Sequence, residues 1–231
     1  MDERRAELAA NLAAVEKRLT DACEAAGRRR EDVTLIAVTK TFPASDVRLL
    51  ADLGVRHVGE NRDQDAAPKA EACADLDLTW HFVGALQTNK ARSVARYADW
   101  VHSVDRDRLV TALGKAAHAA GRTLRCLVEV RLGAGEERAG AEPADVPRLA
   151  ELVASTDGLT LGGVMGIAPL DAPPEPAFVS LAEVAEQVRR VDGGATAISA
   201  GMSADLEAAV CHGATHVRIG TALLGIRPAN R

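Results

Sequence analysis

The segment VTLIAVTK, residues 33–40, sets the pattern that decides the fold. It is a run typical of a buried strand, and it ends in a single lysine. Aliphatic and β-branched residues fill such a run when both faces of a strand are covered. Seven further short runs of this kind follow along the chain, at 56–60, 80–84, 100–104, 124–132, 161–167, 195–200 and 216–220. Stretches of helical length separate them, near 44–53, 62–74, 87–98, 106–120, 144–157, 177–191 and 203–212.

Strands that alternate with helices predict right-handed crossovers and a parallel sheet. Eight of them favour a (β/α)8 TIM barrel, which we expect to form one domain over residues 1–231. The strongest alternative is an open doubly wound sheet, although no G-x-G-x-x-G motif follows the first strand. An additional N-terminal helix is expected, since Leu8, Leu12, Val15 and Leu19 recur at helical spacing.

Composition excludes several classes of protein. The 231 residues are 47% hydrophobic and 26% charged, as in soluble globular proteins. A net charge of -5 argues against a nucleic-acid partner. No run approaches the roughly 20 apolar residues of a membrane span, and the N-terminus lacks the apolar core of a signal peptide. The four cysteines are dispersed, which suits a reducing compartment. We therefore expect a cytoplasmic protein without a membrane partner.

The unusual residues gather after the predicted strands, where barrels carry their chemistry. Lys40 ends the first strand. One interpretation is a lysine whose alkyl chain packs while its ammonium reaches water. The other is an amine with a pKa lowered by desolvation, able to form a Schiff base with an aldehyde. Lys40 alone does not decide between them.

The last two strands are followed by Gly201-Met202-Ser203 and by Gly220-Thr221. Backbone N–H groups at two helix starts, with two hydroxyl groups, suit a phosphate dianion. Ser203 and Thr221 are also ordinary helix-capping residues, and both roles can coexist. Their position after strands seven and eight favours phosphate, which barrels often bind there.

Other candidate sites are weaker. Cys211, His212 and His216 resemble a ligand cluster, but Gly213 should end the helix between the histidines, so no metal site is expected. His81 fits a hydrogen-bonded core histidine. Glu129 and Arg131 alternate along the fifth strand and suggest an ion pair inside the barrel.

Six segments together resemble the family of pyridoxal phosphate homeostasis proteins, single-domain relatives of the N-terminal barrel of bacterial alanine racemase. In chain order they are AVTKTFPASDV (37–47), HVGEN (57–61), WHFVGALQTNK (80–90), GVMGIAP (163–169), SAGMSADLEAAV (199–210) and THVRIGTALLG (215–225). The resemblance implies a barrel that holds pyridoxal 5'-phosphate as a Schiff base on Lys40. It also implies ring contacts from Asn61 and Arg218, the arginine facing the pyridine nitrogen, and phosphate contacts from Ser203, Gly220 and Thr221, with Met202 beside them.

The chain departs from the family pattern in three places. Arg62-Asp63-Gln64-Asp65 replaces a segment that usually carries a tyrosine and a glutamate, and Ala200 replaces a methionine. The loop at 133–140 has Arg138 where a lysine is usual. These changes affect peripheral contacts and not the Schiff-base lysine.

The resemblance leaves a choice between an enzyme and a cofactor carrier. A racemase needs a second acid/base opposite Lys40, which alanine racemase takes as a tyrosine from an additional domain. This sequence has one tyrosine, Tyr97, in a predicted helix, and ends soon after the eighth strand. An arginine at the ring nitrogen also weakens the cofactor as an electron sink. We expect a homeostasis protein without catalytic residues, with apo enzymes that use the cofactor as possible recipients. An amino-acid racemase is the alternative, and a Schiff-base aldolase acting on a phosphosugar is the third.

Overall fold

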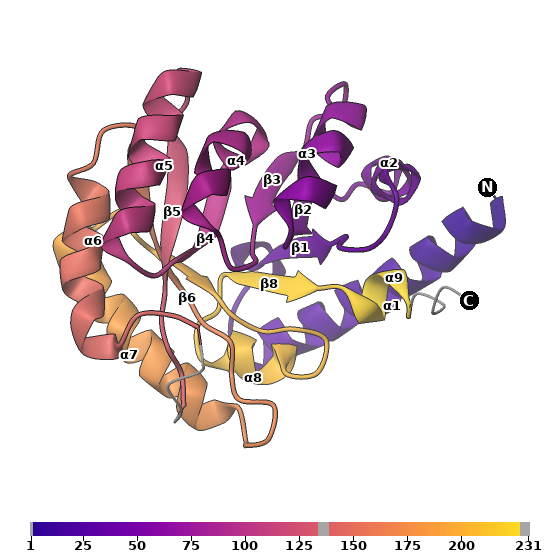
Figure 1. Cartoon of the computed structure of the whole chain (residues 1–231). Helices are drawn as coiled ribbons and strands as arrows, with labels where there is room; N and C mark the ends of the chain where they lie inside the picture. The colour runs from indigo at the N-terminus through magenta and orange to yellow at the C-terminus, as the bar shows by residue number, and fades with distance from the viewer. Residues whose placement is uncertain (1, 134–138, 227–231) are drawn as a thin grey trace.

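The chain closes a barrel of parallel strands with helices around its outside, in a computed structural model that describes residues 2–133 and 139–226 (Figure 1). The strands are β1 (Thr34–Val38), β2 (His57–Glu60), β3 (Thr79–Phe82), β4 (Trp100–Val104), β5 (Leu124–Glu129), β6 (Leu159–Met165), β7 (Ala197–Ser199) and β8 (His216–Ile219). Each pairs with the next, and β8 returns to β1, with Thr34 opposite His216. The predicted TIM barrel is confirmed, and the open doubly wound sheet is wrong.

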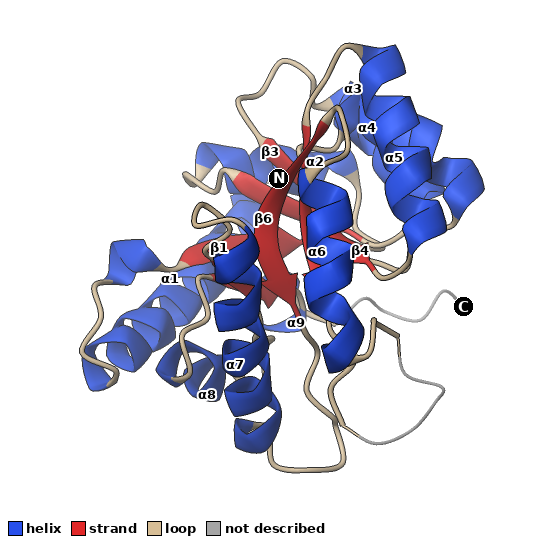
Figure 2. Ribbon diagram, turned by 90° about the vertical axis from the view of Figure 1, so that its left-hand side faces the viewer, coloured by secondary structure: helices blue, strands red, loops and turns tan. Residues whose placement is uncertain are grey.

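Helices cover the outer face of the barrel. They are α1 (Asp2–Ala25), α2 (Ala44–Asp52), α3 (Asp63–Ala72), α4 (Ala91–Tyr97), α5 (Asp107–Ala120), α6 (Val146–Ala154), α7 (Glu175–Val191), α8 (Leu206–Cys211) and α9 (Thr221–Leu224). Figure 2 shows α6 and α7 against β6, which both contact. None of the helices in the described ranges combines the length and apolar character needed to cross a membrane.

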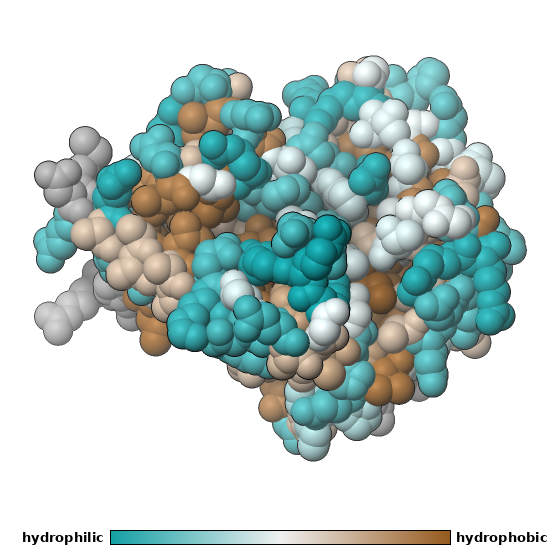
Figure 3. Space-filling model, turned by 180° about the vertical axis from the view of Figure 1, so that it is seen from behind, coloured by the Kyte–Doolittle hydropathy of each residue, from teal (hydrophilic) through white to brown (hydrophobic). Residues whose placement is uncertain are grey.

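The main apolar core lies between the strands and the surrounding helices. Leu109 and Leu113 of α5 pack there with Phe178 and Leu181 of α7. The predicted N-terminal helix is confirmed as α1, whose Leu8, Val15 and Leu19 are buried in one cluster with residues of α8, β8 and α9. Figure 3 shows the face behind that of Figure 1, where hydrophilic side chains are interspersed with smaller apolar patches.

The inside of the barrel is unusually polar. Barrels of this kind are normally filled by layers of branched aliphatic side chains. Here the rings of His57, Trp100, His102 and His216 gather around His81, with neighbouring ring centroids 5.0–6.3 Å apart. His81 is 1% exposed and His102 is fully buried. The interpretation of His81 as a hydrogen-bonded core histidine is therefore confirmed.

Candidate functional site

Four neighbouring strands bring the predicted site residues to one arc of the barrel mouth. The order around the barrel is β7, β8, β1 and β2. Ser203 follows β7, Thr221 follows β8, Lys40 follows β1 and Asn61 follows β2. Since the strands are parallel, all four residues lie at the carboxyl end of the barrel. Lys40 and Thr221 thus follow two adjacent strands, β1 and β8, although they are far apart in the sequence.

The Lys40 side chain is exposed. This corrects the expectation that desolvation acts on its amine, because β1 ends before Lys40 and the residue belongs to a turn. The turn itself is strained: Thr41 has a φ of 69°, in the left-handed region that β-branched residues rarely adopt. Strain of this kind persists only where the surrounding contacts hold the backbone in place.

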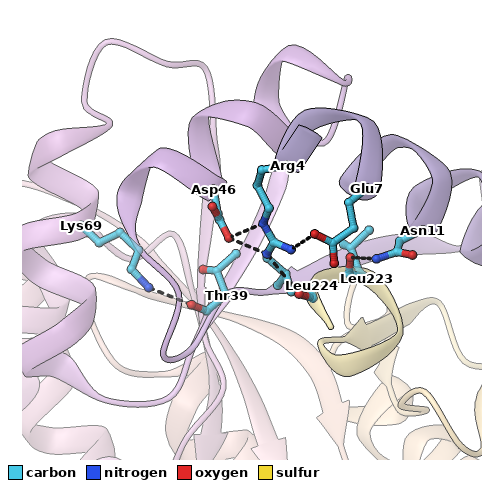
Figure 4. A network of polar contacts seen from close by, with 8 residues as sticks. All are labelled: Arg4, Glu7, Asn11, Thr39, Asp46, Lys69, Leu223 and Leu224. Carbon is cyan, nitrogen blue, oxygen red and sulfur yellow. Dashed lines mark hydrogen bonds and ion pairs between the residues drawn. The ribbon is translucent and has the colours of Figure 1, made fainter. Parts of the chain in front are cut away.

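A buried polar cluster supplies such contacts. Thr39, directly before Lys40, donates its hydroxyl to Oε1 of Glu60 at 2.6 Å, and Nζ of Lys69 donates to the same oxygen. Lys69 also donates to the Thr39 carbonyl oxygen at 2.8 Å (Figure 4). Glu60 and Lys69 are 1% and 7% exposed. An ion pair from α3 and β2 therefore fixes the backbone that presents Lys40.

Asn61 lies at the junction of the ends of β2 and β3. Its side chain is half-buried, and its backbone approaches Gly84 closely. A Cβ atom on Gly84 would lie 2.2 Å from the Asn61 carbonyl oxygen. The glycine of WHFVGALQTNK is thus required because any side chain would separate these two strand ends. The divergent Asp63 turns away to α4, where the Tyr97 hydroxyl donates to it at 3.4 Å.

The segments after β7 and β8 contact each other directly. The Ala222 N–H at the start of α9 donates to Oγ of Ser203 at 3.3 Å. Ser203 does not begin α8, whose N-cap residue is Asp205. Asp205 Oδ1 accepts the Met202 N–H at 2.6 Å and so closes the turn that precedes α8. The expectation of a helix start at Ser203 is corrected, and its hydroxyl lies instead at the first turn of α9.

The N-terminal helix supports both of these segments. Arg18 Nη1 donates to the Ser203 carbonyl oxygen at 3.0 Å, and Asn11 donates to that of Leu223 at 3.0 Å. Arg4 joins Asp46 of α2 at 2.6 Å and the Leu224 carbonyl oxygen at 3.0 Å (Figure 4). The last carbonyls of α9 therefore have partners from α1, so the N-terminal helix holds the rim of the candidate site.

Arg218 is a further buried cation at the barrel mouth, besides Lys69. It is 5% exposed, and burial lowers its pKa to about 10, so it is charged at neutral pH. Its Nη1 donates to Oγ of Ser199 at 2.6 Å and its Nη2 to the Gly166 carbonyl oxygen at 3.0 Å. Burial raises the pKa of Glu129 to about 7, a shift that Asp105 increases and Arg218 opposes. The mouth thus holds a fixed cation and an acid that titrates near neutrality.

The structure contradicts one of the lesser expectations and agrees with another. The Glu129–Arg131 pair is wrong, because β5 ends at Glu129 and Arg131 binds Glu142 at 2.5 Å. His212 and His216 do point apart as expected: Nδ1 of His212 lies 2.8 Å from the Ala208 carbonyl oxygen, while His216 lies inside the barrel. Within the described ranges no group of His, Cys, Asp and Glu is arranged to hold a metal ion. Arg138 lies outside the described residues.

Sequence reasoning missed Lys69 and Ser199 as site residues. Lys69 had a usable signal, because it lies between Ala66 and Ala70 on the buried face of α3. A lysine on such a face needs a buried acid, and Glu60 is the nearest acid at a strand end. Ser199 had no comparable signal, since its partners come from β4 and β8.

Comparison with known proteins supports one family. Residues 10–228 match the family described as alanine racemase, N-terminal domain. The pyridoxal phosphate homeostasis protein of Mycobacterium bovis is 46% identical, over 97% of this chain and 95% of the relative. The structure of PipY from Synechococcus elongatus with PLP bound is 35% identical with a TM-score of 0.83, covering 94% of this chain and 100% of PipY. Alanine racemase from Corynebacterium glutamicum shares the fold, with a TM-score of 0.69 at 13% identity, over 97% of this chain and 62% of the racemase.

Proposed function

The chain belongs to the family of pyridoxal phosphate homeostasis proteins, and on that premise we propose that it binds pyridoxal 5'-phosphate as a Schiff base on Lys40. It captures and releases the cofactor instead of using it for turnover. The observation that carries this proposal is the placement of Lys40 between the end of β2 and the paired segments after β7 and β8. An amine beside a phosphate-binding rim is what a phosphorylated aldehyde requires.

Each residue has a distinct part in this proposal. The cofactor would supply an aldehyde, and Lys40 would supply the primary amine that condenses with it and releases water. Asn61 and Arg218 would contact the ring, and Arg218, held by Ser199 Oγ and the Gly166 carbonyl oxygen, would supply a fixed cation at the pyridine nitrogen. The phosphate is held by Ser203, Gly220 and Thr221, with Met202 beside them. The donor set fits the group, because Ser203 already lies at the first turn of α9, where helical N–H groups lack partners within the helix.

The phosphate contacts give a direct test of the site. We expect pyridoxal to bind far more weakly than its phosphate ester. Ser203→Ala should weaken binding of the phosphate ester by about 1–3 kcal/mol, the range for a hydrogen bond to a charged group. Thr221→Ala should act similarly, or less if its backbone N–H makes the main contact. Equilibrium titration of the full chain with both compounds measures each effect.

A matched control separates binding from folding. Ser155→Ala removes an exposed hydroxyl at the end of α6, where it bonds only locally to Glu151 and Leu152 carbonyls. It should leave both affinities unchanged. Equal affinity for pyridoxal and its phosphate ester, with Ser203→Ala silent, would remove the phosphate site and leave Ser203 as a cap of α9.

The structure gives the racemase alternative no support from Tyr97. Racemisation needs a second acid/base on the face of the substrate opposite Lys40. Tyr97 lies on α4 in the outer layer, packs edge-on against Trp80 and donates to Asp63. Burial and the nearby Asp63 raise its pKa further above the usual value of a tyrosine, which disfavours proton abstraction at neutral pH.

We accordingly expect no racemisation of alanine at enzymatic rates, about 1 per second or faster. The measurement is deuterium incorporation at the substrate α-carbon together with the configuration of the product. Inversion at such a rate would contradict the proposal. Slow exchange with retention would not, because Lys40 can act on one face alone. Glu129→Gln would show whether such exchange uses the buried acid of the mouth, the group that the aldolase alternative also needs.

The partners in this proposal follow from cofactor release. A protein that holds the aldehyde reversibly can pass it to apo enzymes that use pyridoxal phosphate. We propose the cytoplasm as the location of this exchange, because Cys23, Cys73 and Cys126 are buried and unpaired, which suits a reducing compartment.

A further inference from the structure

A continuous chain of hydrogen bonds crosses the inside of the barrel and ends at Arg218. Nδ1 of His57 lies 2.9 Å from Nε2 of His81, and Nδ1 of His81 lies 2.9 Å from Nε2 of His102. Nδ1 of His102 then lies 2.9 Å from Oγ of Ser199, the oxygen that accepts from Arg218 at 2.6 Å. The chain thus joins the start of β2 to the mouth through β3, β4 and β7.

The protonation state of the histidines in this chain of hydrogen bonds follows from their burial. His81 and His102 are 1% and 0% exposed, and burial lowers the pKa of both well below the usual value. Each of these imidazoles is therefore neutral, with one ring nitrogen that donates and one that accepts. Their contacts must then share a single direction along the chain.

Arg218 sets that direction. A guanidinium only donates, so Ser199 Oγ accepts from it, and the Ser199 hydroxyl hydrogen is left for His102. His102 then accepts at Nδ1 and donates from Nε2 to His81, which donates from Nε2 to His57. The opposite direction would aim two donors at Ser199 and leave its buried hydroxyl hydrogen without an acceptor, which is costly.

We propose that Ser199 and His102 are positioning residues, which hold Arg218 in the orientation that meets the pyridine nitrogen of the cofactor. The inference rests on the proposed function, because it is that function which places the ring beside Arg218. The hydrogen bonds that run from Ser199 to His57 keep the Ser199 hydroxyl hydrogen turned away from Arg218. A lone pair of Ser199 Oγ therefore faces the guanidinium. A firmly held cation keeps the pyridine nitrogen unprotonated, and a loosely held one does not.

Other ionisable groups also face Arg218, and the test must separate them. Glu129 from β5 and Asp205 after β7 attract the guanidinium, while His102 and His216 lie close enough to be affected by its charge. Glu129 titrates near pH 7, within the range of any spectral titration. Each variant is therefore compared both alone and in a Glu129→Gln background.

The experiment is a pH titration of the visible absorbance of the full-length protein loaded with pyridoxal 5'-phosphate. Ser199→Ala removes the acceptor for Arg218 and should move the midpoint for pyridine protonation upward by about one pH unit. Ser199→Thr keeps the hydroxyl and should restore the midpoint. Thermal unfolding of each variant shows whether it remains folded.

Two substitutions of His102 each keep a polar group at only one of its two hydrogen-bond contacts. His102→Asn places an amide near the Nδ1 position, toward Ser199, and should keep the midpoint close to that of the wild type. His102→Gln places the amide near the Nε2 position, toward His81, and should shift the midpoint as Ser199→Ala does. His118→Gln is the control, because His118 is exposed and pairs with Asp157 on the surface.

The outcomes separate this inference from the function on which it rests. A normal wild-type titration that no Ser199 or His102 variant moves, even if those variants unfold at lower temperature, would overturn the positioning role alone. A wild type that binds no pyridoxal phosphate would overturn both. Nitrogen-15 NMR of the ligand-free protein provides an independent check of the direction of these hydrogen bonds. We expect the Nε2–H tautomer at His81 and at His102. An Nδ1–H tautomer at His102 would contradict the proposed direction.

Discussion

Replacing Lys40 by alanine should abolish the visible absorbance that the protein acquires with pyridoxal 5'-phosphate. The amine of Lys40 is the proposed attachment point, and no other group replaces a primary amine in a Schiff base. The fold should survive, because the Lys40 side chain is exposed, and the free energy of unfolding should change by no more than about 0.5 kcal/mol. Absorption spectra and thermal unfolding of the same samples measure both effects.

Another exposed lysine provides the control. Lys115 lies on the solvent side of α5, and Lys115→Ala should leave the spectrum intact. Persistence of the full absorbance band in the Lys40→Ala variant would show that the cofactor attaches elsewhere.

Replacing Lys69 by methionine should be the most destabilising of these substitutions. It leaves the carboxylate of Glu60 buried without its cation and removes a hydrogen bond to the Thr39 carbonyl. Breaking a buried ion pair in this way costs about 3–5 kcal/mol. Chemical denaturation should therefore show a large loss of unfolding free energy. Cofactor affinity should fall as well, since the strained turn that presents Lys40 loses its anchor.

Two comparisons isolate the buried pair. Arg48→Met breaks an exposed ion pair with Asp75 and should cost at most about 1 kcal/mol. The double substitution Lys69→Met with Glu60→Gln should recover part of the stability, because no unpaired charge then remains buried. A cost for Lys69→Met no larger than that for Arg48→Met would contradict the structural role given to the pair.

The barrel and one arc of its site could be predicted from the sequence for the same reason. In a parallel barrel the strand ends all meet at one edge, so a lysine after β1 and small polar residues after β7 and β8 must lie together once the strands are located. Local patterns locate those strands. This is why Lys40, Ser203 and Thr221 could be found without knowing any distance between them.

The remainder of the site depends on contacts that local patterns do not contain. His102 meets Ser199 across the inside of the barrel, 97 residues apart, through the inward-facing alternation of β4 and β7. The start of α8 was misplaced because Ser203 and Asp205 are both good capping residues, and the sequence does not show that Met202 to Asp205 forms a closed turn before the helix. The exposure of Lys40 likewise depends on where β1 ends, which periodicity locates poorly.

The most direct measurement is the site of covalent attachment in the wild-type protein. Borohydride reduction of the protein loaded with pyridoxal 5'-phosphate makes a Schiff base permanent, and digestion with peptide mass mapping then locates it. The modified residue should be Lys40, in the peptide that contains the turn after β1. An adduct on Lys90 or Lys115, with Lys40 unmodified, would contradict the proposed site.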